Sequence, residues 1–435
     1  MSNKNFYKVL VSSVSCWNDH SGSDTLPSLL EGYNPEFIST ICYKTDLSTS
    51  DVSSRYFYIC ENDVIKSIFN KKIQTGYETF EKSVVTKQSI EKKRYSFWSK
   101  HRSWLILLMR EFLWFLGKPK GPELIRYIND FKPQVLFCPF ESYIYFNSIN
   151  IWIAKKYNIP VIPILWDDNF TFKQNTFSLF SFIHRLILRK QIRTISKLSP
   201  VFFAISQKAQ DELSKYLKRD VRLITKCASN ELLLERSPIK LNHIKIIYSG
   251  KLNLGRDKTL IKFIEALKVI NEEFNSHVIL DIYAKSIDSK KLAKTISENN
   301  FVSYKGFVSQ QEIKKIQKKY NLLVCLEALK GKNKNISRLS ISTKFVDYLA
   351  SGGCIFNISP KDTATYSYIV QNDIGFCAHD KKTIISCMKE IVENPNLIDK
   401  KIENSLKTCK EKHSMTLNQQ KLYSAIEETV LRKTK

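Results

Sequence analysis

Short apolar runs alternate with amphipathic stretches along the first half of the chain, at the spacing typical of an α/β protein. An amphipathic stretch at residues 122–131 leads through Lys132-Pro133 into the apolar run VLFCPF, and a second at 144–157 leads through Asn158 into IPVIPILW. We interpret these as two helix–strand units of a parallel sheet. The same half predicts strands at 8–15, 37–43, 56–60, 201–206 and 221–224, and helices near 25–31, 180–198 and 207–217.

A polar stretch at residues 229–242 interrupts this pattern, which then begins again. The predicted fold class is therefore α/β, with two Rossmann-like doubly wound domains whose strands point their carboxyl ends at a central cleft. We expect domains at 1–228 and 229–412, and a C-terminal segment, 413–435, whose helix crosses back onto the first domain. The second domain predicts strands at 244–250, 277–284, 302–306, 321–327 and 354–356, and helices at 260–274, 290–299 and 311–320.

Length and composition agree with two globular domains, because 435 residues exceed one ordinary core and 43% of them are hydrophobic. The formal net charge of +26 predicts an anionic partner, which charge alone leaves open between nucleic acid, a phosphorylated small molecule and an acidic membrane. The 10 cysteines form no CxxC pair, so we expect reduced core residues. No secretory signal opens the sequence, which predicts a cytoplasmic protein.

The segment STKFVDYLASG, residues 342–352, is the most informative stretch of the chain. It predicts a loop followed by a helix, and a helix N-terminus offers unpaired amides and partial positive charge to a diphosphate. Lys344 adds a full charge, and Asp347 lies one turn further on, where it could accept hydrogen bonds from a sugar diol. An ordinary capped helix ended by two glycines explains the segment equally simply.

A second anion-binding pattern occurs in YSGKLNLGRDKTL, where Gly250 ends a strand and is followed by Lys251 and Arg256. Glycine allows the backbone to approach a phosphate closely, and two cations would neutralise the charge that develops on a leaving diphosphate. A strand-to-helix turn with solvated basic residues is the alternative. Two such patterns in one predicted domain favour a nucleotide site.

Taken in order, strand-Gly-Lys, YKGFVSQQEI, ISTKFVDYLASG and NDIGFCA resemble the donor half of family 4 glycosyltransferases of the GT-B fold, over about residues 244–378. The resemblance implies that Lys251 and Arg256 bind the donor diphosphate and that Asp347 holds the ribose. It also implies that Gly306, Phe307 and Val308 approach the base, and that backbone amides at Ser342 and Thr343, beside Lys344, contact the diphosphate. Retention of anomeric configuration is a further implication.

The sequence departs from the family pattern at one of two acids that are usually eight positions apart. Leu339 occupies the first position and Asp347, a shorter acid, the second. Glu327 ends the preceding strand, but the basic insert GKNKNISR separates it from the loop. A Ser/Thr-Lys pair before the helix resembles the branch that builds surface polysaccharides. No Asp-x-Asp motif is present, so we expect charge stabilisation by Lys251 and Arg256, with no metal and no further cofactor.

The first half is similar, less specifically, to the acceptor domain of the same fold. Gly22 and Ser23 are expected to line the cleft, and His20 is a weaker candidate in the same loop. Where the family frequently has a histidine after the strand IPVIPILW, this chain has Trp166, Asp167 and Asp168. Either aspartate could orient the acceptor hydroxyl or act as its base. Capping of the following helix is an equally good explanation of both.

Two stretches predict contact with a membrane surface. Residues 180–198 interleave cations with apolar residues as a basic amphipathic helix does, and residues 98–116 are apolar but interrupted by Arg110 and Glu111. Packing of both apolar faces into the first domain is the alternative. Cations near an anionic leaflet would help to recruit the protein to a lipid-linked acceptor.

The sequence thus predicts a glycosyltransferase that moves a sugar from a nucleotide-diphosphate sugar to a glycan or lipid-linked acceptor in polysaccharide synthesis. It is expected in the cytoplasm, peripheral to the inner face of the cell membrane. The alternative is a GT-B scaffold that binds nucleotides or glycans without transfer. Nucleic-acid binding has only charge in its favour. A dinucleotide oxidoreductase is disfavoured because no GxGxxG follows the first strand of either domain.

Overall fold

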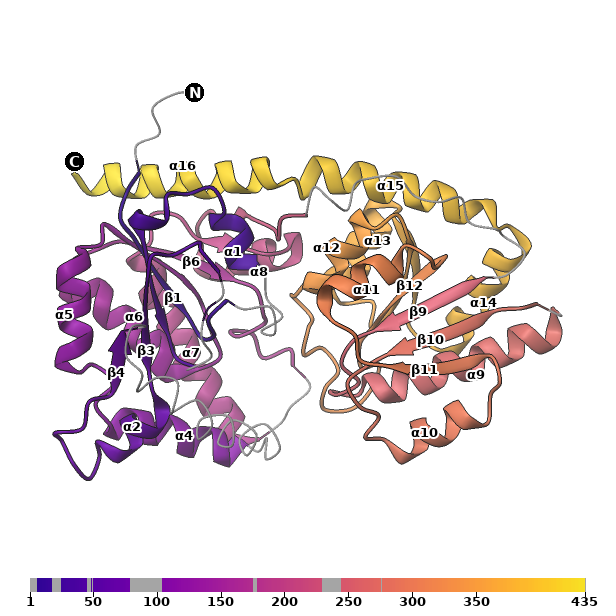
Figure 1. Cartoon of the computed structure of the whole chain (residues 1–435), viewed down its shortest axis with the longest axis horizontal. Helices are drawn as coiled ribbons and strands as arrows, with labels where there is room; N and C mark the ends of the chain where they lie inside the picture. The colour runs from indigo at the N-terminus through magenta and orange to yellow at the C-terminus, as the bar shows by residue number, and fades with distance from the viewer. Residues whose placement is uncertain are drawn as a thin grey trace. The chain divides into compact units, whose positions relative to one another are not determined.

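The computed structural model describes residues 6–17, 25–44, 48, 50–78, 104–174, 178–228, 244–274 and 276–434. The chain divides into two compact units, each built on its own sheet (Figure 1). The N-terminal unit comprises Met1–Phe172, Phe177–Ile224 and Gln419–Lys435, and the C-terminal unit comprises Lys173–Thr176 and Thr225–Asn418.

The N-terminal unit has a sheet of eight strands in the order β4-β3-β2-β1-β5-β6-β7-β8. All neighbouring strands are parallel except β3 and β4. Its strands are β1 Val9–Ser13, β2 Ile38–Cys42, β3 Arg55–Ile59, β4 Gly76–Glu78, β5 Val135–Pro139, β6 Val161–Leu165, β7 Phe203–Ala204 and β8 Arg222–Leu223. Its helices are α1 Thr25–Leu30, η1 Pro35–Phe37, α2 Glu61–Lys66, α4 Trp104–Leu116, α5 Pro122–Phe131, α6 Ile144–Lys156, α7 Leu179–Lys197 and α8 Gln207–Leu217.

The predicted helix–strand units of this sheet are confirmed. In each unit a tight turn ends the helix and leads into the strand. Lys132 follows α5 with φ 54° and Asn158 follows α6 with φ 48°, so each helix ends at a residue in the left-handed conformation. The strands that follow, β5 and β6, are buried at every position. Continuous burial of short parallel strands requires helices on both faces, which is the doubly wound arrangement.

The C-terminal unit has a six-stranded sheet, in the order β11-β10-β9-β12-β13-β14, in which all neighbouring strands are parallel. Its strands are β9 Lys245–Ser249, β10 Ile279–Tyr283, β11 Val302–Gly306, β12 Leu322–Leu326, β13 Cys354–Ile358 and β14 Gly375–Ala378. Its helices are α9 Arg256–Glu273, α10 Lys290–Ser297, α11 Gln310–Gln317, α12 Thr343–Ala350, α13 Ala364–Asn372, α14 Lys381–Glu393 and α15 Asn396–Lys412.

Two apolar clusters cover the two faces of this sheet. Ile246 and Tyr248 of β9 belong to a cluster with α9, α10 and α14, whereas Ile247, between them, belongs to a cluster with α12 and α13. Side chains alternate between the faces of a strand, so helices pack on both sides of the sheet. Both units are therefore Rossmann-like, as the sequence predicted.

The last helix, α16 Met415–Thr434, belongs to the N-terminal unit from Gln419 onward. Gln419 Nε2 donates to the carbonyl of Ser28 at 3.1 Å, and the Tyr423 hydroxyl donates to the carbonyl of Glu31 at 2.9 Å. These bonds join the end of the chain to α1 and the turn after it. The expected return of the C-terminal helix to the first domain is present in the structure.

One expectation about the cysteines is wrong. Cys16 and Cys42 form a disulfide, which joins the loop after β1 to the end of β2. Parallel pairing of β1 with β2 brings these two ends together, although 26 residues separate them in sequence. The other eight cysteines are free, as predicted.

A buried ion pair holds α4 against α2 in the N-terminal unit. Arg110 donates from Nε to Glu61 Oε2 at 2.6 Å, and Trp114 Nε1 donates to the same oxygen at 2.8 Å. Their exposed fractions are 4% for Arg110 and 1% for Glu61, so the pair is isolated from water. Removing one member of such a pair leaves the other charge without compensation.

We therefore expect Arg110→Met to lower the free energy of unfolding by about 3 kcal/mol. The measurement is urea denaturation followed by tryptophan fluorescence. The exposed Lys190 of α7 offers the control, since Lys190→Met should change stability by less than about 0.5 kcal/mol. Equal stability of Arg110→Met and wild type would contradict a structural role for the pair.

Candidate functional site

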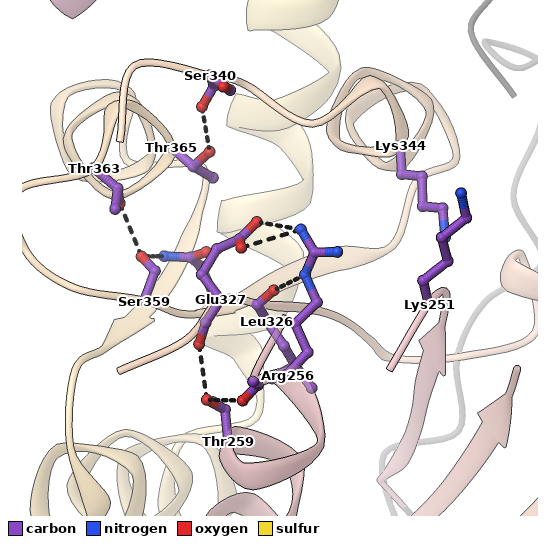
Figure 2. Close-up of polar contacts among 12 residues, drawn as sticks. Lys251, Arg256, Thr259, Leu326, Glu327, Ser340, Lys344, Ser359, Thr363 and Thr365 are labelled. Atoms are coloured by element: carbon purple, nitrogen blue, oxygen red, sulfur yellow. Dashed lines mark hydrogen bonds and ion pairs between the residues drawn. The ribbon is translucent and has the colours of Figure 1, made fainter. Parts of the chain in front are cut away.

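The carboxyl end of β9 brings Lys251 and Lys344 close to each other (Figure 2). Gly250 follows β9, and a Cβ atom at this position would lie 2.6 Å from Lys344 Nζ. A side chain at position 250 would push the ammonium group aside, and the φ of 155° at this position favours glycine in any case. Lys344 Nζ donates to the carbonyl of Ser249 at 2.9 Å, which fixes this lysine beside the strand end.

Positive charge is concentrated around Lys344. Lys344 is exposed as a residue, but partial burial of its ammonium group, together with the charges of Arg256 and Lys251, lowers the pKa of Lys344 to about 8. The side chain of Lys251 is exposed, and its carbonyl accepts a hydrogen bond of 2.7 Å from the Tyr248 hydroxyl, which anchors the loop. An anion here would relieve the repulsion between these groups.

Arg256 is the first residue of α9, after Gly255 in the left-handed conformation at φ 86°. Its Nη2 donates to both oxygens of Glu327, at 3.0 and 3.1 Å, and its Nε donates to the carbonyl of Leu326 at 3.0 Å (Figure 2). Nη1 takes part in none of these bonds. The basic insert after Glu327 does not keep this acid from the site, because Glu327 orients the arginine that was expected to contact the diphosphate.

Helix α12 begins where the sequence predicted, with Ser342 as the capping residue. Among the described residues no side chain caps its N-terminus, and Ser342 is exposed. The backbone amides of the first turn can therefore meet a ligand, and the helix dipole favours an anionic one. Lys344 lies in the same turn, so one element supplies amides and an ammonium group.

Asp347, expected to hold a ribose, forms a buried ion pair. Lys226 Nζ donates to its two carboxylate oxygens at 3.0 and 3.1 Å, and the exposed fractions of Lys226 and Asp347 are 5% and 8%. Lys226 Nζ also lies 3.4 Å from the carbonyl of Thr343. Sequence reasoning missed Lys226, because 121 residues separate it from Asp347. A ribose would have to share Asp347 with this lysine.

Gly306, Phe307 and Val308 lie at the carboxyl end of β11, at the edge of the same sheet. Gly306 has φ 77°, and Phe307 is 72% exposed. Because the strands are parallel, this turn lies on the same edge as Gly250, two strands further out. An exposed aromatic ring at that edge can stack on a flat heterocycle.

The two aspartates after β6 have different environments in the N-terminal unit. Asp167 is exposed, whereas Asp168 is fully buried. The carboxylate of Asp168 accepts hydrogen bonds from the amide of Thr171 at 3.0 Å and from its hydroxyl at 2.5 Å. Asp168 thus closes a turn, and Ser178, rather than either aspartate, caps the helix α7 that follows.

Glu141 is a candidate that sequence reasoning missed. It follows β5 as Asp167 follows β6, and its Oε1 accepts a hydrogen bond of 3.2 Å from Trp166 Nε1. Burial and the negative charge of Asp167 raise the pKa of Glu141 to about 7, which is a suitable value for a general base or acid. The available signal was an acid directly after the buried run VLFCPF. Gly22, Ser23 and His20 lie outside the described residues.

The sequence matches no family model and no curated protein. The structure, by contrast, has the GT-B fold of two Rossmann-like domains, which it shares with solved glycosyltransferases. It superposes on HepE of Anabaena, solved with UDP and glucose, with a TM-score of 0.61 and 10% identity over 97% of this chain and 99% of that one.

Sucrose-phosphate synthase of Thermosynechococcus elongatus is similar too, with a TM-score of 0.63 and 11% identity over 97% of this chain and 98% of that one. Alpha,alpha-trehalose 6-phosphate synthase of Burkholderia multivorans gives a TM-score of 0.61 and 8% identity over 98% and 99%. At identities this low, the superpositions show a shared fold and no more.

The Lys226–Asp347 pair makes the stability of the C-terminal unit depend on both partners. Asp347→Leu should lower the free energy of unfolding by about 3 kcal/mol, because the buried ammonium of Lys226 loses its counter-charge. Adding Lys226→Met should restore most of this loss. Urea denaturation followed by far-UV circular dichroism measures both variants. A double variant as unstable as Asp347→Leu would show that the loss comes from packing instead.

Proposed function

We propose that the protein is a glycosyltransferase of the family 4 type. In this proposal it transfers a hexose from a nucleotide-diphosphate sugar to a glycan or lipid-linked acceptor, with retention of anomeric configuration. The observation that carries the proposal is the crowding of Lys251 and Lys344 beside Gly250, next to the uncapped N-terminus of α12. Such an arrangement is suited to a diphosphate and has no evident structural purpose of its own.

The proposed reaction breaks the bond between the anomeric carbon and the diphosphate oxygen, and the electron pair stays on the phosphate. Lys251 and Lys344 would stabilise that charge, assisted by Arg256 Nη1 and the amides of Ser342 and Thr343. The acceptor hydroxyl forms the new carbon–oxygen bond, and a base takes its proton. These cations fill the role that Mg²⁺ has in other transferases, so we propose that neither a metal nor a cofactor is needed.

The nucleoside would be bound at the same edge of the C-terminal unit. Phe307 offers an exposed ring for the base, and Asp347 offers its carboxylate to the ribose while it stays bound to Lys226. Structures of HepE contain UDP or UDP-glucose, so a uridine diphosphate sugar is the first donor to test.

The acceptor side of the proposal rests on the residues after β5 and β6. Asp167 is exposed and next to Glu141, whose raised pKa allows it to take the proton of a hydroxyl near neutral pH. Asp168 is better suited to positioning, because Thr171 occupies its carboxylate. Gly22 and Ser23 remain predictions for the acceptor loop.

For biological setting we propose the synthesis of a cell-surface polysaccharide such as lipopolysaccharide or capsule, by a protein of the cytoplasm that works at the inner face of the membrane. Among the helices that the structure describes, none is long and apolar enough to cross a bilayer. A lipid-linked acceptor would therefore have to be reached from the membrane surface.

A catalytically inactive GT-B protein that binds nucleotides or glycans is the second candidate. Two observations favour it: Asp347 is already paired with Lys226, and Leu339, at the position of the missing family acid, is fully buried. Such a protein would bind the donor without cleaving it. Turnover of a UDP sugar, even slow hydrolysis, distinguishes the two candidates.

The first test compares wild type with Lys251→Ala in a thermal-shift screen against UDP, GDP, CMP and their sugar conjugates. One nucleotide diphosphate, at a concentration about 100 times its Kd, should raise the Tm of wild type by roughly 5 °C, and of the variant by much less. Where turnover is found, we expect Lys251→Ala to reduce kcat about 100-fold or more.

Lys400→Ala is the matched control for Lys251→Ala, because it removes an exposed lysine of α15 and should leave both quantities unchanged. The unliganded Tm of Lys251→Ala should equal that of wild type, since the side chain is exposed. Absence of a shift with every nucleotide would overturn the proposed donor site.

Binding of the nucleotide diphosphate should also depend on pH through Lys344. The pKa of this lysine is about 8 in the free protein, and a bound diphosphate must raise that pKa by favouring the ammonium form. Affinity is therefore greatest below pH 8 and falls as pH rises above it, with proton uptake on binding near pH 8.5. Calorimetry in two buffers of different ionisation enthalpy measures this uptake. Lys344→Arg should abolish it, and an unchanged uptake in that variant would exclude Lys344 as the source.

A further inference from the structure

Helix α4 has its polar and apolar faces reversed relative to an ordinary surface helix. Its charged residues point inward: Arg110 is bound to Glu61, and Glu111 accepts hydrogen bonds from the amides of Ile144 and Tyr145 at 2.9 and 2.8 Å. Its exposed positions recur at helical spacing and are all large and apolar: Leu105, Met109, Phe112, Phe115 and Leu116. Phe115 is 82% exposed, and folding of the unit alone gives no reason for this.

Helix α7 shows the same reversal with an added charge pattern. His184, Arg185 and Gln191 are buried, and Arg185 Nη1 donates to the carbonyl of Asp168 at 2.8 Å. The exposed positions of its first turns are Leu179, Phe180, Phe182, Ile183, Leu186 and Ile187. The exposed positions of its last turns are Lys190, Arg193 and Lys197. One face of one helix thus changes from apolar to cationic along its length.

The two helices are in contact within the N-terminal unit, where both lie on the side of the unit that α2 also occupies (Figure 1). Phe172, just before α7, lies with its ring 5.3 Å from that of Phe182 and is 48% exposed. We call the exposed apolar side chains of α4 and α7 the apolar patch. Its eleven helical side chains exceed the scattered exposure that is normal for a soluble protein.

Cations border the apolar patch. Lys118 and Lys120 are exposed just after α4, and the three cations of α7 follow its apolar turns. The sequence of α7 contains no acid, and the one acid of α4, Glu111, is held by the amides of α6. An apolar surface bordered by these cations complements the acyl chains and anionic headgroups of a bilayer.

We propose that α4 and α7 form a docking surface for an anionic lipid bilayer, into which the apolar patch inserts while the cations contact headgroups. A second copy of the chain is a poorer occupant, because a two-fold contact through the patch would gather cations of both copies around one interface. The proposal depends on the surface of the N-terminal unit alone, and it would hold whether or not the protein transfers sugar.

The test is co-sedimentation of the full chain with vesicles of phosphatidylcholine alone and with added phosphatidylglycerol. Wild type should pellet with the anionic vesicles and be released by high salt to a large extent. Phe112→Glu with Phe115→Glu, and separately Ile183→Glu with Leu186→Glu, should each lower the partition coefficient at least about tenfold. Lys190→Ala with Arg193→Ala should lower it by a similar factor for anionic vesicles only.

The controls are Val370→Glu, at a 59% exposed apolar position of α13, and Lys290→Ala with Lys291→Ala on α10. Both should bind vesicles as wild type does, and every variant should keep the wild-type Tm because each changed side chain is exposed. Failure of wild type to bind anionic vesicles would overturn the proposal. So would a dimer in sedimentation velocity that the patch variants dissociate, since a second copy would then cover the patch. Nucleotide binding, tested on the same preparations, reports separately on the donor site.

Discussion

Repulsion among cations at the carboxyl end of β9 is the constraint around which the C-terminal unit is organised. Lys251 and Arg256 come from the segment after β9 and Lys344 from the first turn of α12, and the fold holds them together although like charge opposes it. Glu327 pairs with Arg256. The two lysines keep an excess of positive charge, so we expect a bound anion to stabilise this part of the unit.

The architecture was largely predictable, because it depends on patterns that are local in sequence. Continuous apolar runs such as VLFCPF predicted buried parallel strands, and Lys132 and Asn158 marked the ends of the helices before them. The disulfide between Cys16 and Cys42 could not be predicted, since it depends on which strands are neighbours. Strand order in a parallel sheet is set by packing between segments far apart in the chain.

The candidate site was predictable to the same degree. The sequence analysis singled out Gly250, Lys251 and Lys344 because a glycine and lysines near strand ends and helix starts form a recognisable pattern for anion binding. Lys226 and Glu141 were missed because only their contacts in the fold single them out. Lys226 forms an ion pair with Asp347, and Glu141 lies beside Trp166 and Asp167, where its pKa is raised. A sequence shows which residue types are present, whereas pairing and burial decide their charge state.

The close approach of Lys344 to the backbone at Gly250 links two positions that are 94 residues apart in the chain. Any side chain at position 250 would displace the ammonium group, and the φ of 155° there disfavours residues other than glycine whether or not the lysine is present. During evolution the dependence is therefore expected to run in one direction. A chain that keeps Lys344 should keep glycine at position 250, whereas a chain that loses Lys344 can still retain the glycine for its backbone conformation.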